Sequence, residues 1–171
     1  ISDPKLIKVI KLLNGIDEQS GAPYLWEGFI RLDPPFDHDY ELRWHQESYF
    51  TLPNSNSVQF WSPIINKAEK VKTGTVVVME NSFKKGEIPH SIIKQNDNYI
   101  SESISDKRVS NLNYKHQEIE ISPGDVLLFN EHLIHKTFPN KGNKVRFTMI
   151  ANYSNPYLSS FKFMNESEVV A

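Results

Sequence analysis

The sequence contains no cysteine among its 171 residues. Disulfide bonds, thiolate nucleophiles and zinc sites built on thiolates are therefore excluded. A chain without disulfides fits an intracellular, cytoplasmic location. No apolar run approaches the roughly 20 residues that a membrane-spanning helix needs, and no signal peptide is visible at the start. We therefore expect no membrane partner.

The sequence also lacks an excess of charge of either sign. Its 19 basic and 21 acidic residues give a formal net charge of −2. Without a polybasic region, nucleic acid is not predicted as a partner. Hydrophobic residues make up 39% of the chain and aromatic residues 12%, which argues against disorder. The length predicts a single domain, residues 1–171, with a core of its own.

One amphipathic helix is predicted near the start, over residues 3–14. Asp3-Pro4 is typical of an N-cap followed by proline at the first helical position. Gly15 provides a C-terminal stop. Apolar residues recur at helical spacing between these two signals, at Leu6, Ile7, Ile10 and Leu13. We assign residues 1–23 to this helix and its lead-in.

The remainder, from residue 24 to residue 153, has the pattern of short strands separated by turns. The predicted strands are 24–32, 42–50, 57–64, 75–79, 119–121, 126–129 and 145–153, with turns at 33–35, 122–125 and 139–143. Seven or eight strands favour a sandwich or jelly roll. Residues 81–115 interrupt this pattern with a long polar segment, which we predict to form a mobile lid or side wall over the functional site.

The stretch Arg43-Trp44-His45-Gln46-Glu47-Ser48 carries the first candidate site residues. If it is a strand, His45 and Glu47 point to the same face. An imidazole and a carboxylate side by side are two thirds of a 2-His-1-carboxylate iron site. A strand with exposed polar residues would give the same pattern, so the pair alone is weak evidence.

A second histidine and an arginine follow later in the chain. His135 ends a predicted strand, and Arg146 lies eleven residues further on, beyond a turn. In a hairpin both side chains would lie over one cavity. A buried arginine needs a partner; its planar fork suits a carboxylate, to which Thr148 can add a hydroxyl. The carboxylate is either that of a ligand or that of an Asp or Glu of the chain, and the spacing does not decide between them.

Five stretches occur in a distinctive order: Trp44-His45-Gln46-Glu47, Phe60 to Ile64, Thr73 to Gly86, Gly124 to Asn140, and Arg146 with Thr148. Together they resemble the phytanoyl-CoA dioxygenase-like family of Fe(II)- and 2-oxoglutarate-dependent oxygenases. That family has W-H-Q-D, then W-x-P-L, then N-G-x-L…P-G-S-H, then G-D…F…H-x-x-x-x-N…R-x-S. The resemblance covers about residues 30–153.

The resemblance implies a mainly β fold, a cupin-like double-stranded β-helix or jelly roll. It implies that His45, Glu47 and His135 are the catalytic metal ligands. It also implies that Arg146 and Thr148 bind the distal carboxylate of 2-oxoglutarate. The cofactors would be Fe(II), 2-oxoglutarate and dioxygen, with decarboxylation to succinate coupled to hydroxylation of a small-molecule substrate.

The chain departs from the family pattern at two places. Glu47 stands where the family has aspartate, and Glu80 to Phe83 replace P-G-S-H. His132 is an alternative to His135, because residues three apart on an extended chain face opposite sides; the family spacing favours His135. The other histidines are predicted to lie in solvated positions, His90 in a loop and His38 and His116 on the surface.

Two further functions remain open. A cupin-type metal isomerase or hydrolase would need the metal ligands but no clamp for 2-oxoglutarate. A non-catalytic binding module would keep the barrel and lose the chemistry. Joint binding of iron and 2-oxoglutarate distinguishes the oxygenase from both.

Overall fold

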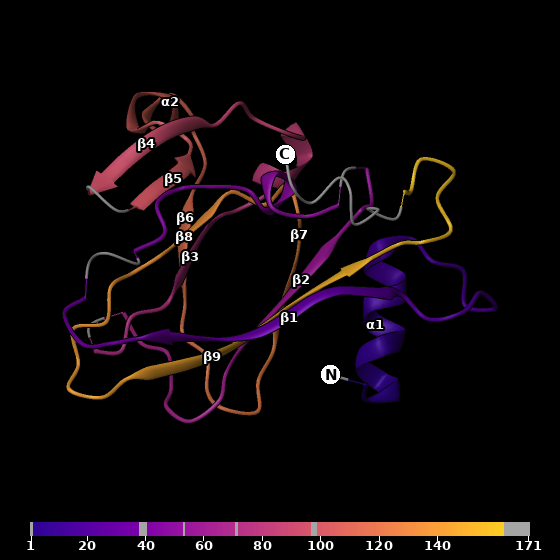
Figure 1. Ribbon diagram of the computed structural model, residues 1–171, viewed down its shortest axis with the longest axis horizontal. Helices are drawn as coiled ribbons and strands as arrows, with labels where there is room; N and C mark the ends of the chain where they lie inside the picture. The colour runs from indigo at the N-terminus through magenta and orange to yellow at the C-terminus, as the bar shows by residue number, and fades with distance from the viewer. Residues whose placement is uncertain (1, 38–40, 53, 71, 97–98, 163–171) are drawn as a thin grey trace.

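The computed structural model describes residues 2–37, 41–52, 54–70, 72–96 and 99–162. Two layers of strands form its body, with one helix beside them and a small excursion at the opposite side (Figure 1). The elements are α1 (Pro4–Asn14), β1 (Tyr24–Asp33), η1 (Glu47–Tyr49), β2 (Val58–Pro63), β3 (Val76–Met79), η2 (Ser82–Lys85), β4 (Ser91–Asn96), β5 (Tyr99–Ser103), α2 (Asp106–Ser110), β6 (His116–Ile119), β7 (Leu127–Asn130), β8 (His135–Thr137) and β9 (Arg146–Ser154).

The strands form two facing antiparallel sheets and one hairpin. The larger sheet has the order β1-β9-β2-β7, and the smaller has the order β6-β3-β8. β4 pairs with β5 alone. The described residues contain nine strands, against the seven or eight predicted. The mainly β jelly roll with a short N-terminal helix is confirmed, and among the described residues no helix is long and apolar enough to cross a bilayer.

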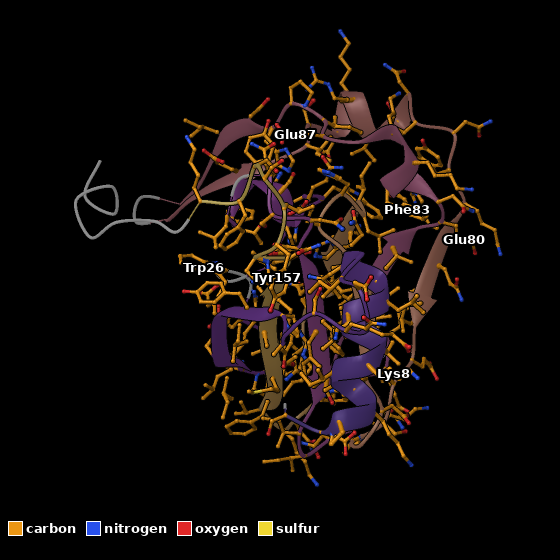
Figure 2. The ribbon with its side chains drawn as sticks, turned by 90° about the vertical axis from the view of Figure 1, so that its right-hand side faces the viewer. Lys8, Trp26, Glu80, Phe83, Glu87 and Tyr157 are labelled. Atoms are coloured by element: carbon orange, nitrogen blue, oxygen red, sulfur yellow. The ribbon has the colours of Figure 1, made fainter. Side chains whose placement is uncertain are left out.

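The helix begins and ends where the sequence predicted. Asp3 Oδ1 accepts hydrogen bonds from the backbone N–H of Lys5 at 2.9 Å and of Leu6 at 3.2 Å, which caps the first turn. Gly15 ends the helix in the left-handed conformation, at φ 68°. Ile10 is fully buried against the outer face of the larger sheet, where α1 covers the strands (Figure 2). Burying such a side chain contributes about 1.5–3 kcal/mol.

The main core lies between the two sheets. Trp61 and Ile150 from the larger sheet meet Val76 and Val78 from the smaller one. All four residues of β3 are buried, as the continuous valine run predicted. This core holds the sheets face to face, and other side chains on the same inner faces form the site described below.

Residues 81–115 contain more regular structure than their polarity suggested. They include η2, the β4–β5 hairpin and α2. We call this segment the insert. Its apolar residues Ile88 and Ile104 pack with Trp44, Val77 and Met79 in a second buried cluster. The insert therefore packs against the smaller sheet as well as interrupting the order of the barrel strands.

The mobility of the insert remains a prediction. Its described part has one β-hairpin and short helices but few buried residues, so we expect local opening at low free-energy cost. Amide hydrogen exchange without ligand should be fast in residues 81–115 and slow in β7. Equal protection of the two segments would contradict the prediction.

Two local predictions were wrong. Residues 42–50 do not form a strand: His45 makes a single bridge and the chain then turns into η1. Residues 139–143 do not close a hairpin either, because β8 pairs with β3 while β9 pairs with β1 and β2. The cause in both cases is long-range pairing, which local sequence patterns do not encode.

Candidate metal centre

Three of the predicted site residues lie together inside the barrel. Glu47 Oε1 lies 3.3 Å from His45 Nε2 and 3.3 Å from His135 Nε2. One donor atom from each side chain lies within 4.8 Å of both others. All three residues are buried. His45 and His135 are 90 residues apart in the sequence, and the fold brings them together with Glu47.

Backbone pairing sets this geometry. The N–H of each histidine donates to the carbonyl of the other, at 2.9 Å from His45 and 3.0 Å from His135. The bridge pairs His45 with His135 on the edge strand β8 of the smaller sheet. It places the two imidazoles side by side, with ring centroids 4.2 Å apart. The 3-10 turn after Gln46 then directs Glu47 back toward both rings. A turn, rather than the predicted strand alternation, brings Glu47 to its position.

Hydrogen bonds to the backbone fix the tautomers of both histidines. His45 Nδ1 donates to the carbonyl of Arg43 at 2.6 Å, and His135 Nδ1 donates to the carbonyl of Leu133 at 2.9 Å. A carbonyl can only accept, so Nδ1 carries the proton in each ring. Nε2 of each ring, 3.3 Å from Glu47, is the nitrogen left to bind a metal.

The charges of the cluster also suit a cation. Burial alone would raise the pKa of Glu47, but the two imidazoles, which donate to it from Nε2 when they are protonated, outweigh burial and hold that pKa well below its usual range. Burial lowers the pKa of His135, and the neighbouring His45 adds to this effect. An ionised carboxylate beside a neutral imidazole is the donor set that first-row metals take.

The spacing fits one metal ion. Nitrogen and oxygen ligands lie about 2.0–2.2 Å from such a metal, so neighbouring ligand atoms at right angles lie about 3 Å apart. The observed separations of 3.3 Å are close to that value. Three groups converging from one side would leave the opposite side of the ion open.

Arg146 is buried at the start of β9, but it has a partner within the chain. Its Nε and Nη2 lie 3.2 and 2.9 Å from Asp33 Oδ2, and Nη1 donates to the carbonyl of Thr73 at 3.0 Å. Gly74 allows this approach, since a β-carbon there would lie 2.7 Å from Nη1. Arg31 Nε lies 2.9 Å from the other oxygen of Asp33. Two guanidinium groups thus share one carboxylate.

Thr148 lies two residues beyond Arg146 on the same inner face of β9. It is fully buried, and its hydroxyl has no hydrogen-bond partner among the described residues. A buried hydroxyl without a partner costs free energy unless something else bonds it. The position is therefore suited to a polar ligand.

A cavity of about 370 Å³ is lined by part of the proposed site, but Arg146, Thr148 and His135 are not among its lining residues. His45 and Glu47 line it, together with Arg31, Gln59 and Asn152 from the larger sheet. Asn152 is 2% exposed and its Oδ1 has no partner among the described residues. A larger hollow of about 700 Å³ runs along α1 and is not lined by the metal-type cluster of His45, Glu47 and His135. Of these two cavities, the smaller one is lined by the proposed metal ligands His45 and Glu47.

The structure separates the remaining histidines. His132, the alternative to His135, is partly exposed and lies outside the metal-type cluster. His116 is exposed and stacks on Trp44, with centroids 4.9 Å apart. His38 lies outside the described residues. His90 is not a solvated loop residue: it is partly buried and accepts a hydrogen bond from Gln46.

Sequence reasoning missed Asp33, Gln46 and His90 as members of the site. Asp33 was read as part of a turn before two prolines, and nothing local pairs it with Arg146. Gln46 lies between two proposed ligands in the stretch Trp44-His45-Gln46-Glu47, and this position was the signal that could have identified it as part of the site.

The fold and the cluster together define the class of this protein as a cupin-like barrel with a two-histidine, one-carboxylate centre. The sequence model described as phytanoyl-CoA dioxygenase (PhyH) matches residues 34–148. The chain belongs to that family.

Particular relatives are consistent with this. The chain is 26% identical over 98 residues to 1-deoxypentalenic acid 11-beta-hydroxylase of Streptomyces arenae, covering 56% of this chain and 34% of the hydroxylase. EvdO2 of Micromonospora carbonacea var. aurantiaca, solved with 2-oxoglutarate, is similar in fold with a TM-score of 0.70 at 15% identity, over 94% of this chain and 64% of that one. The non-heme monooxygenase ThoJ gives 0.67 at 18% identity, over 90% and 53%.

Proposed function

We propose that this protein is an Fe(II)- and 2-oxoglutarate-dependent dioxygenase that hydroxylates a small molecule. The observation that carries the proposal is the convergence of His45, Glu47 and His135 at ligand spacing inside the barrel. Because the chain spans 34–64% of the relatives described above, the activity is proposed for the site and not taken from any of them.

In this proposal the metal is held by His45 Nε2, His135 Nε2 and Glu47 Oε1. Ferrous iron with 2-oxoglutarate bound would supply the activation of dioxygen and the removal of a hydrogen atom from the substrate. The chain's own part is to hold the Nδ1 proton of both imidazoles on backbone carbonyls, so that Nε2 faces the metal position, and to keep Glu47 ionised.

The distal carboxylate of 2-oxoglutarate would bind at Arg146 and Thr148. The unpartnered, fully buried hydroxyl of Thr148 supports this assignment. Asp33 is already a partner of Arg146, so in this proposal the carboxylate of 2-oxoglutarate would share the guanidinium with Asp33.

Joint binding of metal and cosubstrate is the direct test. Under anaerobic conditions, Fe(II) and 2-oxoglutarate together should give a weak visible charge-transfer band that neither gives alone. In air, succinate release should depend on both. A screen of small molecules for increased succinate release then identifies the substrate.

One observation favours a second function. Because Arg146 already has Asp33 as a partner, the chain can be a cupin-type metal isomerase or hydrolase without any cosubstrate. In that case Fe(II) would bind with no effect of 2-oxoglutarate on its spectrum. Absence of metal binding would leave the non-catalytic binding module.

A further inference from the structure

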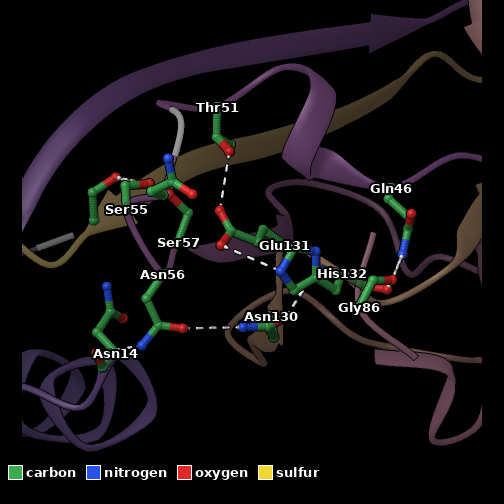
Figure 3. Close-up of polar contacts among 12 residues, drawn as sticks. Asn14, Gln46, Thr51, Ser55, Asn56, Ser57, Gly86, Asn130, Glu131 and His132 are labelled. Atoms are coloured by element: carbon green, nitrogen blue, oxygen red, sulfur yellow. Dashed lines mark hydrogen bonds and ion pairs between the residues drawn. The ribbon is translucent and has the colours of Figure 1, made fainter. Parts of the chain in front are cut away.

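Gln46 lies between two of the proposed metal ligands and is fully buried. Its Nε2 donates to the carbonyls of Gly86 at 2.9 Å and His132 at 2.6 Å, and Figure 3 shows the first of these contacts. Its Oε1 accepts from the N–H of Ile88 at 2.7 Å. One side chain therefore ties the ligand segment both to the insert and to the turn before His135.

The backbone N–H of Gln46 is bonded by a side chain, not by a strand. It donates to His90 Nε2 at 2.9 Å. His90 Nδ1 donates to the carbonyl of Ile88 at 2.8 Å, which leaves Nε2 as the acceptor. Burial lowers the pKa of His90 to about 4, so the acceptor form is present at neutral pH.

The imidazole of His90 is itself held in place. Its ring stacks on Tyr49, with centroids 3.9 Å apart and planes at 38°. The N–H of His90 donates to the Tyr49 hydroxyl at 3.3 Å. Both ring nitrogens are thus bonded and one face is covered, which defines the orientation of the imidazole.

The two residues of the insert that flank the β4–β5 hairpin bond the ligand segment on both sides of His45. On one side His90 accepts from the N–H of Gln46, and on the other the N–H of Ile104 donates to the carbonyl of Trp44 at 2.7 Å. His135 bonds the opposite edge of His45. His45 thus lies in a segment that is bonded to His135 along one edge and to two residues of the insert along the other.

We propose that His90 is a positioning residue for the metal centre: its imidazole acceptor holds the N–H of Gln46, and thereby the spacing of His45 and Glu47. The metal side of this proposal rests on the proposed function. Through His90 the insert and the centre are coupled, since moving the insert away removes the acceptor. Groups that support metal ligands from behind commonly change metal affinity by about 10- to 100-fold when lost.

The test compares two replacements of His90. His90→Phe keeps a flat ring against Tyr49 but removes the acceptor, whereas the amide of His90→Gln can place an oxygen near the position of Nε2. Glu87→Gln, an exposed change in the same segment, is the matched control (Figure 2). Circular dichroism establishes that each variant is folded.

The first measurement is hydrogen exchange at single amides of the metal-free protein. The Gln46 amide should exchange about tenfold faster in His90→Phe, the scale of a lost buried hydrogen bond. It should stay near the parent rate in His90→Gln and Glu87→Gln. The His135 amide, bonded to His45 on the opposite edge, is the internal reference and should not change. An unchanged Gln46 rate, or equal acceleration at His135, would overturn the proposal.

The second measurement is anaerobic titration with Fe(II). We expect affinity to fall by about tenfold or more in His90→Phe and to recover in His90→Gln. Parent-like affinity in His90→Phe would overturn the positioning role. If the parent bound no Fe(II), the proposed function would fail, and the exchange measurement would still decide whether His90 holds the ligand segment.

Discussion

Glu47→Ala is expected to abolish turnover and to weaken Fe(II) binding strongly. The carboxylate is the only anionic member of the proposed ligand set, and it lies 3.3 Å from both Nε2 atoms. Its removal leaves two neutral imidazoles, which bind a divalent cation through fewer bonds and with no compensating charge. Titration with Fe(II) and an assay of succinate release measure the two effects.

Glu47→Asp should keep the charge and still lose most of the activity. Shortening the side chain by one methylene moves its oxygens by about 1.5 Å, and site geometry tolerates only about 0.5 Å. Glu80→Asp and Glu80→Ala, at an exposed ion pair with Lys115 on the edge of the molecule (Figure 2), are matched controls expected to behave as the parent.

Two outcomes would change the interpretation of Glu47. Higher activity in Glu47→Asp would mean that the site is built for the aspartate found in the family. Normal iron binding and turnover in Glu47→Ala would mean that Glu47 is not a ligand, and the proposal of an oxygenase would be withdrawn.

Removing the guanidinium of Arg146 is expected to weaken 2-oxoglutarate binding by about 1.5–3 kcal/mol or more, the scale of a hydrogen bond to a charged group, while Fe(II) binding stays nearly unchanged. Arg146→Lys is expected not to restore this binding fully. Lysine keeps a positive charge near Asp33 but cannot make the planar two-point contact of a guanidinium. Arg43→Lys, the same change at an exposed side chain, is the control. Binding is measured by titration of the iron-loaded protein.

The Asp33 contact requires a further variant. Arg146→Ala would leave a buried carboxylate short of a partner, and breaking such a pair costs about 3–5 kcal/mol of stability, so its unfolding must be measured alongside binding. Asp33→Asn releases the guanidinium, and the clamp interpretation predicts that 2-oxoglutarate then binds at least as tightly. Unchanged affinity in folded Arg146→Ala and Arg146→Lys would assign Arg146 to a structural pair alone.

Local signals predicted the fold well where the physics is local. The helix followed from Asp3-Pro4 and Gly15, because capping depends on neighbouring residues. β1, β2, β3 and β9 followed from alternation or from a buried valine run. The prediction of a strand over residues 42–50 was wrong. The segment makes only a single bridge at His45 and then a 3-10 turn, although its alternating pattern is that of a strand.

The sequence by itself determined the mainly β class, the family, and the identities of His45, Glu47 and His135 as candidates, because each rests on residue type and order along the chain. Only the tertiary structure decided that Asp33 partners Arg146, and that His90 accepts from Gln46. These contacts join residues 113 and 44 positions apart. No local pattern specifies them, because they form only when packing of the two sheets and the insert brings the groups within bonding distance.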